Sequence, residues 1–224
     1  VNLIYCLLRH FKRIKPDLIL SFTIKPNIFG AIAAKFSRRK CIPNITGLGY
    51  IFIRGGVISQ ITTYLYKIAV KMSSFIFLQN YDDYSMLKSL NVIRNSNNIK
   101  IIPGSGVDLE KFNYKGVNNS SSIIFMYAGR FLWDKGIGEL IEAFKVVQRG
   151  YPASKLVFIG GFFPTNPAAI KPEELNDWIE AGLVEYHGMV DNVSEHISNA
   201  DCVILPSYRE GMPRSLLEAS AMGK

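Results

Sequence analysis

The chain alternates short apolar runs with amphipathic segments of helix length along almost its whole course, and this alternation constrains its fold more than any other feature. Strand-length apolar runs separated by helical segments are typical of βαβ units, which form parallel sheets flanked by helices. The pattern predicts strands at residues 17–22, 41–45, 74–79, 100–103, 123–128, 155–159, 184–187 and 202–205. It predicts helices at residues 1–15, 26–35, 60–72, 82–90, 137–149, 172–181, 192–199 and 215–222.

A polar stretch at residues 115–122 interrupts this alternation, and the strand–helix pattern restarts after it. We therefore predict an α/β fold of two Rossmann-like, doubly wound lobes, residues 1–112 and 113–224, joined by a linker. The chain opens on Val1 inside an amphipathic segment and stops just after a predicted helix. Both lobes are accordingly expected to be incomplete, as in a fragment of a longer protein. The first predicted strand, 17–22, is expected to be buried on both faces of its sheet.

Composition excludes several classes of protein. With 48% apolar and 20% charged residues among 224, the chain can bury a core, which excludes intrinsic disorder. Its three cysteines, Cys6, Cys41 and Cys202, lack the spacing of a zinc site, which favours reduced thiols in a cytoplasmic setting. No apolar run approaches the roughly 20 residues that a membrane-spanning helix needs. Asp82 and Asp83 open a predicted helix and are interpreted as its N-terminal cap rather than as a metal site.

Charge is divided unevenly between the two lobes. Residues 1–112 carry 16 Lys and Arg against 5 Asp and Glu, whereas residues 113–224 carry 10 against 13. A basic lobe can bind nucleic acid or an anionic membrane surface. At such a membrane each Lys or Arg contributes about 1 kcal/mol to the free energy of binding. Within the first helical segment, Arg9, Lys12 and Arg13 lie mostly apart from the apolar stripe. This arrangement fits an ordinary solvated face as well as a membrane-surface helix, and both interpretations stay open here.

Ligands of open parallel sheets bind outside the carboxyl ends of the strands, so the residues that follow each strand are candidates for a site. The predicted strand 123–128 is followed by GRFLWDKG, which runs from Gly129 to Gly136. Arg130 and Lys135 in this loop precede a predicted helix, whose N-terminus offers free N–H groups and partial positive charge. Together they form a candidate clamp for a diphosphate; the alternative is an ordinary solvated loop.

A second candidate region follows the predicted strand 202–205. Glu210 lies on the loop before a helix that begins near Pro213, and Glu218 lies more than one turn inside this helix among apolar neighbours. A carboxylate in apolar surroundings needs hydrogen-bond donors, and the vicinal diol of a ribose or hexose supplies two O–H groups at matching spacing. Two glutamates at this separation also occur by chance. The interpretation as a binding site is favoured because the pair follows a strand end and occurs together with the basic loop.

Taken together, these segments resemble the retaining glycosyltransferases of family 4, which have the GT-B fold. The resemblance rests on the E-x7-E pattern of REGMPRSLLEA, from Glu210 to Glu218, and on the GR-x4-KG segment upstream of it. PGSGVDLEKF, from Pro103 to Phe112, is similar to the family's inter-domain crossing. FTIKPNIFG and NITGLGYIF are similar to the subgroup that builds bacterial surface polysaccharides and glycans on a lipid carrier.

The resemblance implies a role for each matching residue. As catalytic residues, Arg130 and Lys135 bind the donor's diphosphate and stabilise the charge of the leaving group, and Glu210 contacts hydroxyls of the donor sugar. Glu218 holds the ribose diol, and the backbone at Val190 contacts the nucleobase. Front-face transfer with retention then needs no protein nucleophile, no cofactor and no metal. The remaining substrate-binding positions implied by the resemblance are Gly129, Gly211, Met212 and Pro213.

The resemblance also implies partners and a location. The donor is a UDP-sugar, with a UDP-linked N-acetylhexosamine favoured, and the acceptor is a polyprenyl-diphosphate-linked saccharide. The protein is expected to be peripheral on the cytoplasmic, inner face of the cell membrane, against an anionic membrane surface, and no nucleic acid is expected. Two alternatives stay open: a catalytically incomplete module that binds membranes or anions, and a GT-B sugar-nucleotide epimerase.

Overall fold

The structure is a computed structural model that divides into two compact units. The first unit consists of residues 1–104 together with 210–212, and the second of residues 105–209 together with 213–224. The polar stretch that suggested a division between residues 112 and 113 falls partly, at 117–121, outside the described part of the chain. The described residues are 2–49, 52, 55–94, 98–116 and 122–224.

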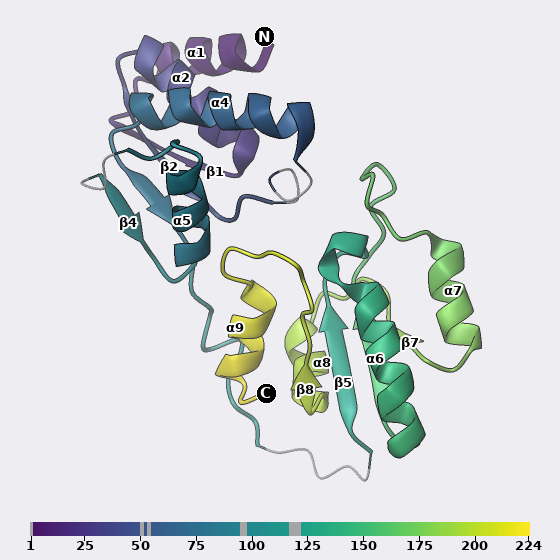
Figure 1. The fold of residues 1–224 in the computed structure, drawn as a ribbon. Coiled ribbons are helices and arrows are strands. Elements are labelled where there is room, and N and C mark those ends of the chain that lie inside the picture. Colours follow the sequence, from purple (N-terminus) through teal and green to yellow (C-terminus); the bar gives the residue numbers. More distant parts are fainter. Residues whose placement is uncertain (1, 50–51, 53–54, 95–97, 117–121) are drawn as a thin grey trace. The chain divides into compact units, whose positions relative to one another are not determined.

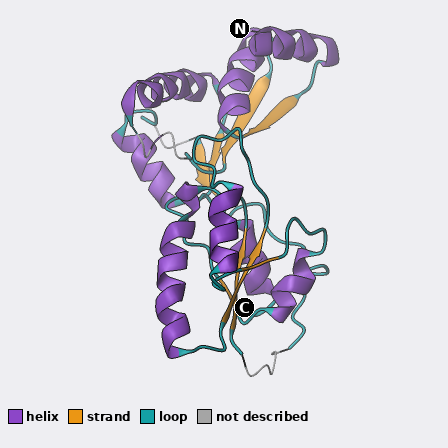
Figure 2. Ribbon diagram, turned by 90° about the vertical axis from the view of Figure 1, so that its right-hand side faces the viewer, coloured by secondary structure: helices purple, strands orange, loops and turns teal. Residues whose placement is uncertain are grey.

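Each unit contains a four-stranded parallel sheet with helices packed on it (Figure 1, Figure 2). This confirms the predicted α/β fold with two Rossmann-like sheets. In the first unit the strand order is β1-β2-β3-β4, so it follows the chain. Right-handed crossovers then put the connecting helices α2, α4 and α5 on one face of the sheet. The elements of this unit are α1 (Asn2–Ile14), β1 (Leu18–Phe22), α2 (Ile24–Phe36), β2 (Lys40–Ile45), α4 (Gly56–Met72), β3 (Ile76–Leu78), α5 (Tyr81–Ser89) and β4 (Ile99–Ile101).

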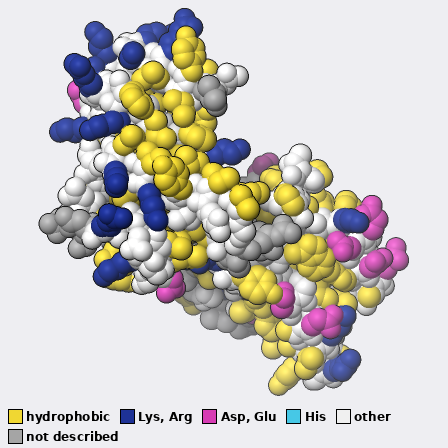
Figure 3. Space-filling view, turned by 45° about the horizontal axis from the view of Figure 1, so that its top comes forward, with side chains coloured by type: hydrophobic (Ala, Val, Ile, Leu, Met, Phe, Trp, Pro, Cys, Tyr) yellow, Lys and Arg dark blue, Asp and Glu magenta, His cyan; other side chains and the backbone are white. Residues whose placement is uncertain are grey.

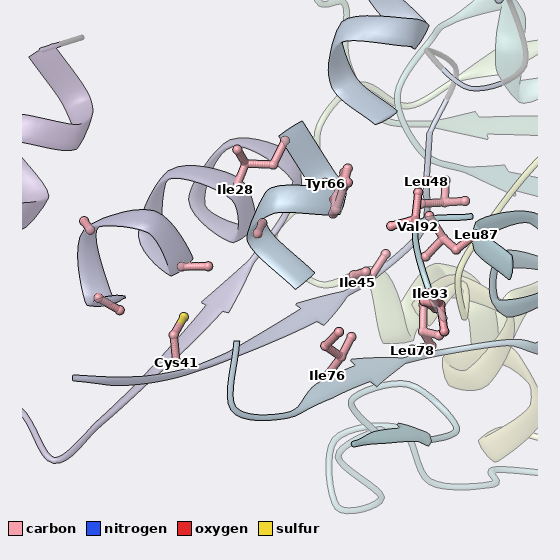
Figure 4. Close-up of a cluster of buried hydrophobic side chains, with 14 of the residues drawn as sticks. Ile28, Cys41, Ile45, Leu48, Tyr66, Ile76, Leu78, Leu87, Val92 and Ile93 are labelled. Atoms are coloured by element: carbon pink, nitrogen blue, oxygen red, sulfur yellow. The ribbon is translucent and has the colours of Figure 1, made fainter. Parts of the chain in front are cut away.

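A core between this sheet and its helices holds the first unit together (Figure 4). Alternate strand positions, such as Cys41 and Ile45 on β2 and Leu78 on β3, are buried in it. From the helices, α2 contributes Ile28 and three alanines, and α4 contributes Tyr66. The small alanine side chains allow α2 to lie close to the sheet.

The expected burial of the first strand on both faces is wrong. Leu18, Leu20 and Phe22 share one face of β1 and are 45%, 57% and 49% exposed, whereas Ser21 on the other face is buried. Both faces of a parallel strand are buried only where helices cover both faces of the sheet. Here the crossover helices lie on one face, and no described element covers these three positions.

The helix after β3 begins with a different cap from the one predicted. Asn80 is the N-cap of α5, because its Oδ1 accepts a hydrogen bond from Asp83 N at 2.7 Å. Asp82 and Asp83 lie in the first turn of α5, where acidic side chains complement the helix dipole. Asparagine caps a helix as well as aspartate does, and Asn80 lies two residues before Asp82 in the sequence.

In the second unit the strand order is β7-β6-β5-β8, again with parallel neighbours. The chain moves outward from β5 through β6 to β7 and then returns to place β8 on the other side of β5. Its elements are β5 (Ile124–Ala128), the 3-10 helix η1 (Trp133–Lys135), α6 (Ile137–Gly150), β6 (Lys155–Ile159), α7 (Pro172–Glu180), β7 (Glu185–Tyr186), α8 (Val193–Asn199), β8 (Cys202–Val203) and α9 (Arg214–Ala221).

The return to β8 puts helices on both faces of the second sheet. Tyr127 and Phe158 pack with residues of α6 and α7 in one core, whereas their chain neighbours Met126 and Val157 pack with residues of α8 and α9 in another. Successive residues that alternate between two cores define a doubly wound sheet. This double burial explains why these strands are continuous apolar runs in the sequence.

Candidate functional site

The strand order of the second unit reverses between β5 and β8, and such a switch point is where open α/β sheets bind ligands. The loop after β5 comprises residues 129–136, and the chain between β8 and α9 comprises residues 204–213. Both regions chosen from the sequence therefore begin at this switch point. The first of them includes η1, which the sequence analysis did not predict.

Three glycines bring the strand ends of this sheet close together. Gly129 N donates a hydrogen bond to Ile159 O at 2.9 Å, and Gly160 N donates one to Gly188 O at 2.9 Å. A Cβ on Gly160, whose φ is +141°, would lie 1.8 Å from Gly129 O, so only glycine fits there. The loops after β5, β6 and β7 thus form a continuous rim at the carboxyl edge of the sheet. Val190, the predicted nucleobase contact, lies half-buried in the last of these loops.

The loops after β5 and β8 also contact each other. Gly136 has a φ of +68°, and a Cβ there would lie 2.2 Å from Pro206 O. Tyr208 N donates to Asp134 O at 3.3 Å, and the Tyr208 hydroxyl donates to the carboxylate of Glu139 in the first turn of α6. This hydrogen bond lowers the pKa of Glu139. The basic loop and residues 206–208 are therefore packed together within the second unit.

Arg130 and Lys135 lie toward the two ends of the loop after β5. The hydroxyl of the buried Tyr127 donates to Arg130 O at 2.8 Å, which fixes the backbone at that point. The exposed guanidinium of Arg130 lies 5.7 Å from the centroid of the Phe163 ring. Lys135 ends η1, and Gly136 alone separates it from the first residue of α6. Both cations thus belong to the segment that leads from the end of β5 into a helix N-terminus, a position suited to an anion.

Glu218 lies inside α9 with only 13% of its side chain exposed. Its Oε1 is 3.1 Å from Nη2 of Arg214, one turn earlier in the helix. The Arg214 side chain is 66% exposed, and ion pairs of such exposed groups contribute no more than about 1 kcal/mol. Hydroxyl donors of a ligand can therefore replace this partner at small cost. Pro213 is the N-cap residue of α9.

Glu210, Gly211 and Met212 belong to the first unit. The Asn80 amide donates to Glu210 O at 3.0 Å and to Gly211 O at 2.9 Å. Met212 N donates to Oε1 of Gln79 at 3.2 Å. The backbone of this short segment is therefore held by the two residues that follow β3.

The sequence-predicted site residues consequently fall into two groups. Glu210 and Glu218, which were predicted from one motif, belong to different units, and their joint role stays a prediction. The first unit contains Glu210, Gly211 and Met212, and the second contains Gly129, Arg130, Lys135, Val190, Pro213 and Glu218.

Sequence reasoning missed two buried polar atoms in the switch-point loops. Asp134 Oδ1 and Ser207 Oγ are buried and have no hydrogen-bond partner among the residues that the structure describes. Because buried polar atoms are normally satisfied, both are candidates to bind water or a group of a ligand. Their places inside GRFLWDKG and directly after Pro206 were the only signal that could have indicated them.

Within the described ranges, no group of three or more His, Cys, Asp or Glu side chains could hold a metal ion. None of the described helices has both the length and the apolar character needed to cross a bilayer. The expectation of a reaction without metal or cofactor stays a prediction.

Comparison with known proteins gives this arrangement a context. Residues 122–224 match the family described as "Glycosyl transferases group 1". Over 98% of its length, the chain is 30% identical to the N,N'-diacetylbacillosaminyl-diphospho-undecaprenol alpha-1,3-N-acetylgalactosaminyltransferase of Campylobacter jejuni, of which it covers 60%. Over 95% of its length, it is 26% identical to the UDP-Gal:alpha-D-GlcNAc-diphosphoundecaprenol alpha-1,3-galactosyltransferase of Escherichia coli, of which it covers 57%. It is also 28% identical over 95% of its length to the capsular polysaccharide biosynthesis glycosyltransferase CapM of Staphylococcus aureus, covering 58%.

Solved structures agree with these matches in fold. Anabaena Alr3699/HepE in complex with UDP has a TM-score of 0.75 at 18% identity, with 100% of this chain and 62% of that one covered. A glycosyltransferase from Rickettsia africae has a TM-score of 0.71 at 16% identity, with 100% and 60% covered. The chain thus spans less than two thirds of the length of the relatives named here. The two parallel sheets match GT-B glycosyltransferase structures, and with the family match over residues 122–224 they support a GT-B glycosyltransferase.

Proposed function

We propose that the protein containing this chain is a retaining glycosyltransferase of family 4. It transfers a sugar from a UDP-sugar, with a UDP-linked N-acetylhexosamine favoured, to a polyprenyl-diphosphate-linked saccharide. It acts as a peripheral protein on the inner face of the cell membrane, in the biosynthesis of a surface polysaccharide or glycan. The acceptor class is supported by two relatives whose names specify sugars on diphospho-undecaprenol. The pathway is supported by the similarity to CapM.

The observation that carries this proposal is the switch point of the second sheet. There Arg130 and Lys135 bracket the segment between the end of β5 and the N-terminus of α6. Arginine offers a planar fork to phosphate oxygens and lysine a point charge, so the two suit the two phosphates of a nucleoside diphosphate. The N–H groups of the first turn of α6 add further donors for an anion.

In the proposed mechanism, negative charge grows on the diphosphate as its bond to the sugar breaks, and Arg130 and Lys135 stabilise that charge. Glu210 orients the sugar through its hydroxyls, and Glu218 holds the ribose diol. No side chain acts as nucleophile: an oxygen of the departing phosphate accepts the acceptor's proton, and the new bond forms on the same face of the sugar. The positions that line the donor in this proposal are Gly129, Val190, Gly211, Met212 and Pro213.

Transfer by the complete gene product tests these roles. Lys135→Ala and Glu210→Ala are expected to lower kcat/KM about 100-fold or more, because each removes a charge that contacts the donor in the transition state. Lys145→Ala and Glu142→Ala are matched controls, since these residues form an exposed ion pair on α6. Unimpaired transfer in both Lys135→Ala and Glu210→Ala would overturn the assigned roles.

A panel of UDP- and GDP-sugars tests the donor and the stereochemistry. The proposal expects product with the anomeric configuration of the donor, measured by NMR, and undiminished transfer in EDTA because no metal takes part. Inverted product contradicts retention, and loss of transfer in EDTA contradicts the metal-free mechanism. Release of an epimerised sugar nucleotide would identify an epimerase instead. Salt-sensitive vesicle binding without any thermal protection by UDP-sugars would identify a binding module.

A further inference from the structure

A pocket with a cavity volume of about 410 Å³ lies in the first unit, at the amino-terminal ends of β3 and β4. Ile76 and Ile99, the first residues of these strands, line it together with the second half of α4. Ligands of parallel sheets usually bind at the opposite, carboxyl edge, so this pocket is not part of the site described above. Its lining residues are Tyr64, Lys67, Ile68, Val70, Lys71, Ser73, Ile76, Asn91, Val92, Arg94, Asn98 and Ile99.

The lining combines positive charge with an apolar floor. Lys67, Lys71 and Arg94 supply three cations, and no acidic side chain is among the described residues that line the pocket. Ile76 and Val92, which also line the pocket, are buried. Three cations above an apolar floor favour a ligand that carries both negative charge and apolar surface.

The outward face of α4 continues this pocket as an apolar stripe. Val57, Ile58, Ile61 and Tyr64 are each at least 55% exposed, and Tyr64 belongs to both the stripe and the pocket. Residues 57, 61, 64, 68 and 71 follow helical spacing, so Lys71 ends the same face on which Val57 begins. Figure 3 shows hydrophobic side chains gathered on the first unit with Lys and Arg around them.

An apolar helix face bordered by Lys and Arg is the pattern of helices that lie in the interface of an anionic membrane. We propose that the pocket binds the phosphate headgroup of an anionic lipid while the stripe of α4 lies among the lipids around it. This inference rests on the peripheral membrane location in the proposed function and names the surface that makes the contact. It assigns the contact to α4 and the pocket, not to the cations of α1.

Co-sedimentation of the full chain with vesicles of phosphatidylglycerol and phosphatidylcholine tests the proposal. Lys71→Gln combined with Arg94→Gln is expected to lower the partition coefficient about 25-fold at low salt, or about fivefold per cation. Arg9→Gln combined with Lys12→Gln removes the same charge from α1 and is expected to leave most of the binding. Ile58→Ser combined with Ile61→Ser is expected to lower partition about tenfold without changing its dependence on salt. Unfolding curves of all three double variants verify that they fold.

If the double variant in α1 lowers the partition coefficient more than the Lys71 and Arg94 double variant does, the assignment to α4 is overturned. Inorganic phosphate provides the second arm. If it stabilises the chain in a Lys71- and Arg94-dependent way while vesicles do not bind, the pocket serves a free phosphate and the lipid proposal fails. Transfer to a water-soluble acceptor analogue separates this outcome from the proposed function. Transfer without vesicle binding refutes only the lipid site, and vesicle binding without transfer refutes only the enzyme.

Discussion

Among the described residues of the first unit, Tyr66 has the most strongly shifted pKa. Burial raises the pKa of its hydroxyl to about 12, against a smaller opposing effect of the Asn27 amide. No hydrogen bond of ordinary length reaches the hydroxyl from the described residues. Because the folded state keeps this proton longer than the unfolded state, its contribution to stability is complete below pH 10 and is lost as the pH rises toward 12.

Tyr66→Phe tests this linkage. At neutral pH we expect the free energy of unfolding to change by less than about 1 kcal/mol, because the variant removes a buried hydroxyl that lacks a partner. Between pH 10 and 12 the wild type is expected to lose about 2 kcal/mol more than the variant, at about 1.4 kcal/mol per pKa unit. Urea unfolding across this pH range measures both. Tyr64→Phe, at an exposed hydroxyl, is the control and should follow the wild type.

Gly160 is the residue of the strand-end rim that tolerates change least. Gly160→Ala puts a Cβ 1.8 Å from Gly129 O, so the loops after β5 and β6 must separate. We expect a loss of about 3 kcal/mol or more in the free energy of unfolding and, under the proposed function, weaker UDP binding. Gly150→Ala, at the end of α6 with nothing within 4 Å, is the matched control and should be neutral or slightly stabilising. Equal stability of the two variants would contradict the close approach.

At the scale of elements, Asn80 performs two separable tasks. Its Oδ1 caps α5, and its amide nitrogen donates to the carbonyls of Glu210 and Gly211. Asn80→Ser keeps a capping oxygen but loses the reach to residues 210–212, whereas Asn80→Ala loses both.

We expect hydrogen exchange to separate the two tasks of Asn80. The Met212 amide, which bonds Gln79 next to Asn80, should exchange faster in both variants. The Asp83 amide should exchange faster only in Asn80→Ala. Stability should fall by about 1–2 kcal/mol in Asn80→Ser and by about 1 kcal/mol more in Asn80→Ala. An unchanged Met212 amide in both variants would mean that Asn80 does not hold the segment.

The elements that the sequence could predict are those whose signal is local. The strands and helices of both sheets follow from hydrophobic periodicity, and their observed bounds differ from the expected ones mainly at the ends. The exposed face of β1 could not be predicted, because burial depends on which helices cover a sheet. The place of Glu210 in the first unit could not be predicted either. It depends on the hydrogen bonds that Asn80 donates to Glu210 and Gly211, which lie 130 and 131 positions later in the sequence.

At the scale of the whole molecule, the two units do not share a hydrophobic core: the first has one and the second has one on each face of its sheet. Leu78 is buried in the first and Phe158 in the second. We expect Leu78→Ala to speed hydrogen exchange mainly in residues 1–104 and Phe158→Ala mainly in 122–224, each at a cost of about 2–5 kcal/mol. If the protein binds UDP as proposed, UDP should slow exchange in the second region in wild type and in Leu78→Ala. Equal effects of both truncations on both regions would mean that the cores are not independent.

The contact of Gly136 with Pro206 limits how this segment can be exchanged with that of another protein. Because these backbones touch, the segment 129–136 fits only a partner loop with a matching path. A chimera that imports residues 129–136 from a relative must import residues 204–209 from the same source. The two stretches therefore have to be exchanged together, although 67 residues separate them in the sequence.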